Sequence, residues 1–172
     1  MAFPADRLDT RGSRRVDAGD DPVVTAVPAA IDALIAMARA DTVIGGSGVR
    51  VDDGPWMSPP EDQELVVIGW VPIEGPTVAW VEDIVTINAG RQSETFDTHC
   101  LARVWRPDAV LKAARDRADE IFEAIRAMVR ADHTLRGAVD QAQVAAQHLT
   151  SRQSSTGGCS VSIDFVVQSQ VF

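Results

Sequence analysis

Residues 94–106 read ETFDTHCLARVWR, and residues 108–131, which follow almost directly, read DAVLKAARDRADEIFEAIRAMVRA. In the first stretch, small or apolar side chains alternate with larger polar ones, a period of two that is typical of a half-buried β-strand. The predicted inward side chains are Phe96, Thr98, Cys100, Ala102 and Val104. The second stretch has apolar residues at helical spacing and predicts a long amphipathic helix. Its apolar stripe consists of Val110, Ala114, Ile121, Ile125 and Met128.

The charged side of this helix also follows helical rules. Lys112–Asp116 and Arg115–Asp119 have the i,i+4 spacing of surface ion pairs. Arg126 and Arg130 lie near the predicted C-terminal end, where the helix dipole favours cations.

The remaining elements are predicted from shorter patterns. Thr25 as N-cap and Pro28 in the first turn favour a helix over residues 26–40. Strand-like runs follow at residues 49–52, 65–71 and 78–88. The chain closes with two further runs on either side of Gly157 and Gly158, which predict a β-hairpin. These closing runs are residues 143–152 and 159–168.

The order of these elements predicts the fold class. Strands dominate and do not alternate with helices, which favours an α+β fold, with an antiparallel or mixed sheet packed against two helices. Residues 1–22 are polar and mixed in charge, without the apolar centre of a signal peptide. We expect them to form a flexible N-terminal arm, and residues 23–172 to form a single domain.

Charge and cysteine content narrow the class of protein. The chain has 25 acidic and 16 basic residues and a formal net charge of −9, which disfavours gripping of nucleic acid or of an anionic membrane. No apolar run approaches the roughly 20 residues of a membrane span. Cys100 and Cys159 are too few for a disulfide scaffold, and both lie in strand-like runs. We therefore expect them to be small buried side chains.

No pattern of catalytic or ligand-binding residues stands out. Residues 45–48 (GGSG) lack the lysine of a phosphate-binding loop and lead into a strand. His99 and Cys100 are neighbours on one strand, so their side chains face opposite sides of the sheet. The acidic groups, including Glu61–Asp62–Glu64, are expected on solvated faces and turns. We expect no catalytic residue, metal or cofactor, and hence no enzyme.

Tryptophan supplies the large aromatic side chains, since the chain has four Trp and no Tyr. Each lies in or beside a predicted strand. Core packing is expected for two or three of them and a subunit or partner interface for the rest, because Trp is enriched at the centres of contacts. The candidate interface residues are Trp56, Trp70, Trp80 and Trp105.

The order of elements and several local sequences resemble the tail terminator (tail completion) proteins of long-tailed bacteriophages and related gene-transfer-type particles. The resemblance spans residues 27–172. Its matching pieces are the helix 27–40, the strand and turn 49–55 (VRVDDGP), the run 65–69 (LVVIG), the strand 94–106 with the helix 108–131, and the hairpin ending at 162–167 (SIDFVV).

This resemblance implies a structural virion protein without catalytic residues. It implies a homo-oligomer, a hexameric ring, that caps the tail tube protein, ends tube polymerisation and joins the tail to a head-neck connector or stopper protein. DNA would pass through the ring's lumen without specific binding, and no membrane would be involved. The protein would be assembled in the host cytoplasm and reside in the tail-neck region of the virion.

Two other classes remain open from the sequence. One is another neck or tail component, either a head-closure protein or a tail tube subunit. The other is a small-molecule-binding or enzymatic α+β domain, whose polar strand faces would carry Glu82–Asp83 and His99–Arg103. A nucleic-acid-binding module is disfavoured by the sign of the charge.

Overall fold

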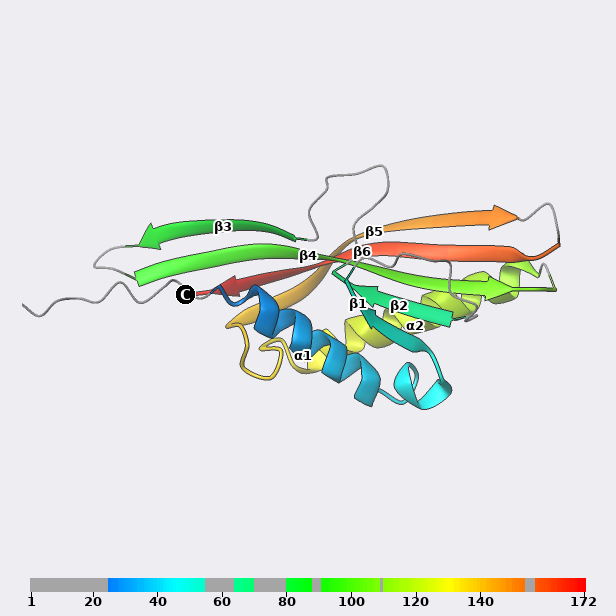
Figure 1. Ribbon diagram of the computed structural model, residues 1–172, viewed down its shortest axis with the longest axis horizontal. Helices are drawn as coiled ribbons and strands as arrows, with labels where there is room; N and C mark the ends of the chain where they lie inside the picture. The colour runs from blue at the N-terminus through cyan, green and yellow to red at the C-terminus, as the bar shows by residue number, and fades with distance from the viewer. Residues whose placement is uncertain (1–24, 55–63, 70–79, 88–90, 109, 154–156) are drawn as a thin grey trace, which may run out of the picture.

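The computed structural model describes residues 25–54, 64–69, 80–87, 91–108, 110–153 and 157–172. This part of the chain forms two α-helices and one six-stranded sheet (Figure 1). The helices are α1 (Val27–Ala40) and α2 (Leu111–Ala131). The strands are β1 (Arg50–Asp53), β2 (Glu64–Ile68), β3 (Trp80–Ile87), β4 (Arg91–Arg106), β5 (Gln141–Gln153) and β6 (Cys159–Val171).

Strand β4 is the centre of the sheet. The strand order is β1-β2-β4-β6-β5, and β3 also pairs with β4. Since β6 occupies one edge of β4, β2 and β3 share the other edge, with β3 on residues 91–98 and β2 on residues 100–104. Among the described strands, only β1 and β2 pair in parallel, so the sheet is mixed. The expected α+β fold and its closing β5–β6 hairpin are confirmed.

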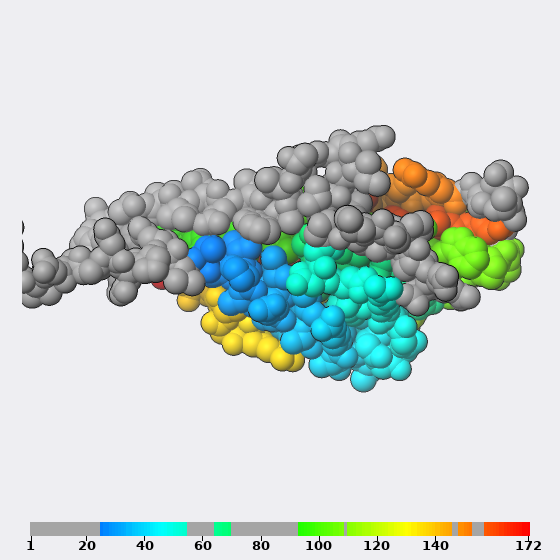
Figure 2. All heavy atoms as spheres, in the orientation of Figure 1, coloured from blue at the N-terminus to red at the C-terminus, as the bar shows by residue number. Residues whose placement is uncertain are grey.

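Both helices pack on the same face of this sheet (Figure 1). One apolar core joins them to the strands, and its members on β4 are Phe96, Cys100, Ala102 and Val104, as the alternation predicts. Phe122 of α2 meets Phe165 of β6 edge to face, with ring centroids 5.3 Å apart. Figure 2 shows α1 (blue) and the segment that leads to β1 (cyan) as one continuous surface on this side.

The N-terminus of α1 is capped by a side chain from the sheet. The N-cap residue is Ala26, not the predicted Thr25, and it has no capping side chain of its own. Instead the Glu94 carboxylate of β4 accepts the Ala26 N–H, with N–O distances of 3.0 and 3.2 Å, and also the Thr25 hydroxyl. Glu94 is 9% exposed. The positive end of the helix dipole also stabilises a carboxylate at this position.

Two glycines end the first strand pair. Gly54 (φ +73°) donates its N–H to the Ile68 carbonyl at 2.8 Å. Gly69 (φ +78°) donates its N–H to the backbone carbonyl of His99 at 2.9 Å. Positive φ is a conformation that side chains rarely tolerate, so both positions favour glycine. Strand β2 therefore ends at Ile68, before the predicted end at Val71, which lies outside the described residues.

Several boundaries and contacts differ from expectation. Helix α2 begins at Leu111 instead of Asp108, whose carboxylate accepts the Val110 N–H at 3.2 Å. Val110, placed in the apolar stripe from the sequence, precedes the helix and is exposed. The Lys112–Asp116 pair forms, and Arg115–Asp119 does not appear among the ion pairs of the described chain. The predicted arm, residues 1–22, lies outside the described residues. None of the described helices is long and apolar enough to cross a membrane.

Replacing Glu94 by alanine removes the partner of two donors at the start of α1. We expect the free energy of unfolding to fall by about 1–3 kcal/mol, because a partly buried N–H and hydroxyl lose their acceptor. Urea unfolding followed by circular dichroism measures this. Asp119→Ala, an exposed change on α2, is the matched control, and equal stability of the two variants would contradict the capping role.

Both cysteines are buried and unbonded, as expected from the sequence. Burial raises the pKa of the Cys100 thiol to about 12. Since the thiolate is the reactive form, we expect neither thiol to react with Ellman's reagent at pH 8 in the folded protein. Both should react once the protein is unfolded in guanidinium. Rapid labelling of the folded protein would contradict the burial of these side chains.

Candidate assembly interface

A row of the sheet is a set of residues that lie in register across neighbouring strands. Strands β3 and β5 lie at the two opposite ends of the same rows. Where β3 is present, the sheet is four strands wide, in the order β3-β4-β6-β5. One such row reads Asp83, Thr95, Gln170, Gln141, and another reads Val81, Asp97, Gln168, Gln143. Within the described chain, neither β3 nor β5 has a strand on its outer side. Both therefore present unpaired backbone groups along an edge.

A register shift divides β5 into two halves. It lies between Ala145 and Gln147. The half before it, residues 141–145, shares its rows with β3, whereas Thr150 beyond it shares a row with Arg50 of the short strand β1. The edge strands β3 and β1 lie on the side of the sheet opposite β5. They therefore share rows with different halves of β5. A bulge of this kind changes the local twist of an edge strand.

The second face of the sheet, opposite α1 and α2, is mainly polar. At the end near β3 it carries an amide-rich shallow hollow of about 170 Å³. Its lining residues are Thr95, Gln141, Gln143, Gln168 and Gln170. The Gln143 amide donates to the Gln168 carbonyl oxygen at 3.2 Å. This hollow is therefore lined by uncharged hydrogen-bonding groups.

Further along the second face lie charged side chains that are partly buried. Asp164 of β6 lies in register between Leu101 and His148. Burial raises the pKa of Asp164, and the neighbouring His148 lowers it to a smaller extent. Its buried Oδ1 has no hydrogen-bond partner among the described residues. Burial, and then the charge of Arg152, lowers the pKa of Arg103, and the Arg103 Nε donates to the Ser160 hydroxyl at 3.3 Å.

A small apolar cluster on the second face was not expected. It consists of Leu65, Val67 and Leu101, each less than 5% exposed. Strand β2 is therefore buried on both faces, which explains its continuous apolar sequence. Leu101 interrupts the polar side of the alternating stretch in β4, and this interruption was the available signal in the sequence.

The four tryptophans chosen from the sequence are only partly placed. Trp105 is half-buried in β4 and packs beside Gly158, where an added Cβ would lie 3.4 Å from the indole ring. Trp80 begins β3, but its side chain is outside the described residues. Trp56 and Trp70 also lie outside them. A role for these residues at an interface stays a prediction.

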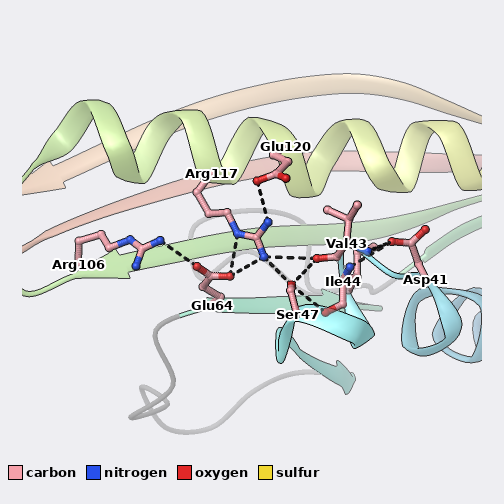
Figure 3. A network of polar contacts seen from close by, with 8 residues as sticks. All are labelled: Asp41, Val43, Ile44, Ser47, Glu64, Arg106, Arg117 and Glu120. Atoms are coloured by element: carbon pink, nitrogen blue, oxygen red, sulfur yellow. Dashed lines mark hydrogen bonds and ion pairs between the residues drawn. The ribbon is translucent and has the colours of Figure 1, made fainter.

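Glu64 is the clearest residue that sequence reasoning misjudged. It was expected on a solvated face or turn, but it starts β2, and its side chain is 17% exposed. Figure 3 shows it between Arg106 and Arg117. Its carboxylate accepts hydrogen bonds from the guanidinium groups of Arg106 in β4, at 3.0 Å, and Arg117 in α2, at 2.9 Å. Both partners are more than 40 residues away along the chain, so local sequence gives no signal for the network.

Arg117 extends the same network to the loop after α1. Its guanidinium donates to the Ser47 hydroxyl at 2.6 Å, to the Val43 carbonyl at 3.3 Å and to Glu120 at 2.7 Å (Figure 3). The hydrogen bond to Glu64 is the main reason that the pKa of Arg117 is raised. The GGSG loop is thus tied to α2 through Ser47 and begins with a short 3₁₀ turn, Gly45–Ser47.

No group of three or more His, Cys, Asp or Glu side chains in the described residues is arranged to hold a metal ion. His99, His133 and His148 lie on β4, after α2 and on β5. His99 and Arg103 share the second face of β4 with Asp97.

Comparison with known proteins identifies no family. No family model matches the sequence, and no curated protein matches it. Among solved structures, a chain from the virion of a native gene transfer agent (GTA) particle is similar, with 16% sequence identity and a TM-score of 0.43. The alignment covers 82% of this chain and 92% of that chain. A similarity at this level establishes no function for the present chain.

Asp164 provides a test of the second face. Because burial raises its pKa in the folded state, the ionised carboxylate opposes folding above that pKa, and this cost disappears as the pH falls through it. We expect Asp164→Asn to raise the free energy of unfolding at pH 7, with a smaller difference from the unaltered protein at pH 3. Urea unfolding at both pH values measures this. Asp97→Asn, on the same face, is the control, and a pH-independent difference for Asp164→Asn would contradict the desolvation.

Proposed function

We propose that this protein is a structural component of a tailed, phage-like particle that forms a ring at the end of the tail tube. The ring would end tube polymerisation and join the tail to the head-neck proteins. The observation that carries the proposal is the pair of unpaired sheet edges, β3 and β5, on opposite sides of the same rows. The resemblance to tail terminator proteins supplies the particular role and the number of six subunits.

Strand direction makes these two edges compatible with each other. Directions alternate across β3, β4, β6 and β5, so a second copy in the same orientation brings its β3 antiparallel to β5 of the first. Such a contact is heterologous, and it forms a ring when the rotation between copies closes. Closure pairs every β3 and β5 edge and removes the liability of exposed strands.

The distribution of ionisable groups also favours a structural role over a catalytic one. Among the described residues, the groups with shifted pKa values fall in four places: Cys100 in the core, Arg117 in the Glu64 network, Asp132 in the turn after α2, and Arg103 with Asp164 on the second face. A catalytic site usually brings such groups together in one cleft. We propose that none of them is catalytic.

Passage of DNA through the ring is a further part of the proposal. A chain with a net charge of −9 repels the phosphate backbone, so DNA would move through the lumen without specific binding. Electron cryomicroscopy of assembled particles tests this. A lumen wall lined by arginine side chains would contradict it.

The ring itself is tested by multi-angle light scattering and negative-stain microscopy of the purified protein. We expect a mass near six times that of the 18.5 kDa chain and six-fold rings of constant height. Rings added to tail tubes should cap their ends and prevent further growth.

Other outcomes distinguish the alternatives. Long cylinders formed by the protein alone would identify a tube subunit. A monomer that caps added tubes would agree with the role but would place ring formation at the tube end. A monomer that leaves the tubes uncapped would overturn the proposal and favour the ligand-binding class.

A further inference from the structure

A basic cleft lies between the C-terminal half of α2 and the first residues of β5. Its volume is about 390 Å³. Arg126, Arg130 and His133 line it together with Gln143, above a floor that includes the buried side chains of Val129 and Ala142. The cleft thus combines an apolar floor with two guanidinium groups and an imidazole.

Within the described residues, the positive charge of this cleft is only partly balanced. Arg126 pairs with Glu123 at 2.6 Å and lies over the Phe122 ring, 5.7 Å from its centroid, so its position is held. Arg130 forms no ion pair within the described residues. The two arginines are four residues apart on one helix, a spacing at which like charges repel. The helix dipole accounts for a cation at Arg130, but not for a cleft beside it.

The nearest carboxylate along the chain is already engaged. Asp132 accepts the Thr134 hydroxyl at 2.7 Å and the backbone N–H groups of Thr134 and Arg136 at 3.1 and 3.0 Å. These hydrogen bonds hold the turn after α2 and lower the pKa of Asp132. Its oxygen atoms are therefore hydrogen-bonded within the turn, although its charge also acts on His133. The two arginines of the cleft retain capacity for an added anion.

The position of the cleft indicates where that anion comes from. Ala142 and Gln143 belong to the half of β5 that borders the rows of β3. Strand β3 carries two consecutive acidic residues, Glu82 and Asp83. Within one chain, Glu82 stands in the row of Phe96, Ser169 and Ala142. Consecutive strand residues face opposite sides of a sheet, and Glu82 is the one whose row contains the core residue Phe96 on the helix side, where the cleft lies. A neighbouring β3 laid along this half of β5, with the rows continued, therefore brings Glu82 to the level of the cleft.

The other exposed edge fits less well. Strand β1 has only four residues, and its Asp52 is already paired with Arg50 at 2.8 Å. Its rows reach the half of β5 beyond the register shift, away from Ala142 and Gln143. β1 also carries a second acidic residue, Asp53, so strand length and register, more than charge, favour β3.

We infer that the Arg126–Arg130–His133 cleft is the receptor for Glu82 of β3 from a second copy of this chain. The inference rests on the proposed ring and assigns the electrostatic contact that sets its subunit register. Carboxylate–guanidinium pairs are directional and strong when they are partly desolvated. They also disfavour pairing of β5 with the wrong edge.

Complementary charge reversals test this assignment. One variant carries Arg126→Glu and Arg130→Glu, and the other carries Glu82→Arg. We expect each alone to lose at least tenfold in ring formation by light scattering. Mixed in equal amounts, they should assemble, because alternating copies restore opposite charges at every contact. Arg130→Glu alone keeps the Arg126–Glu123 pair and should weaken assembly less.

The matched control is Lys112→Glu with Arg115→Glu, which makes the same change of net charge on α2 outside the cleft. It should assemble like the unaltered protein. If the unaltered protein assembles only on tail tubes, the same variants are scored by capped tube ends.

The outcomes separate this inference from the proposed function. Rings of normal mass from both reversed variants, or a mixture that fails to assemble, would overturn the inference and leave the ring intact. Reversed variants that form rings but no longer cap tubes would assign the cleft to the tube protein, which also overturns it. Failure of the unaltered protein both to form rings and to cap tubes would overturn the proposed function itself.

Discussion

Strand β4 is hydrogen-bonded along both of its edges, and this continuous pairing determines where the other elements lie. Its sixteen residues pair with β6 on one side and with β3 and β2 in succession on the other. One face of the strand forms the core beneath both helices. Polar residues near its two ends anchor other elements: Glu94 caps α1 and Arg106 binds Glu64 of β2. A slip of one residue in β4 would exchange its two faces and break each of these contacts.

The fold separates the surfaces that stabilise it from those proposed for assembly. Burial of apolar side chains is concentrated between the sheet and the two helices, with the Glu64–Arg117 network closing one side of that layer. The strand edges, the polar second face and the basic cleft contribute less to this core. A protein of this kind can present edges and charges to a second copy without weakening its own packing, provided that those edges are covered on assembly.

Much of the fold follows from local patterns in the sequence. The alternation in residues 94–106, the helical stripe in residues 108–131 and the closing hairpin were all predictable, because periods of 2 and 3.6 residues report directly on the buried face. The burial of Cys100 and Cys159 followed from their places in strand-like runs. The errors lie where polar residues meet partners distant in the sequence. Glu64 was assigned to a solvated face or turn. Thr25 was predicted as the N-cap; its hydroxyl accepts the Val27 N–H at 3.3 Å, but the N-cap is Ala26 and Glu94 accepts its N–H.

The sequence by itself therefore determined the types of element, their order and the face that each one buries, because these depend on neighbouring residues. It also determined a net charge that disfavours nucleic-acid binding. Only the tertiary structure decided that β3 and β5 border the same rows, that β2 is buried on both faces, and that Arg126, Arg130 and His133 surround one cleft. Strand order and register depend on contacts between residues far apart along the chain, and no local periodicity encodes those contacts.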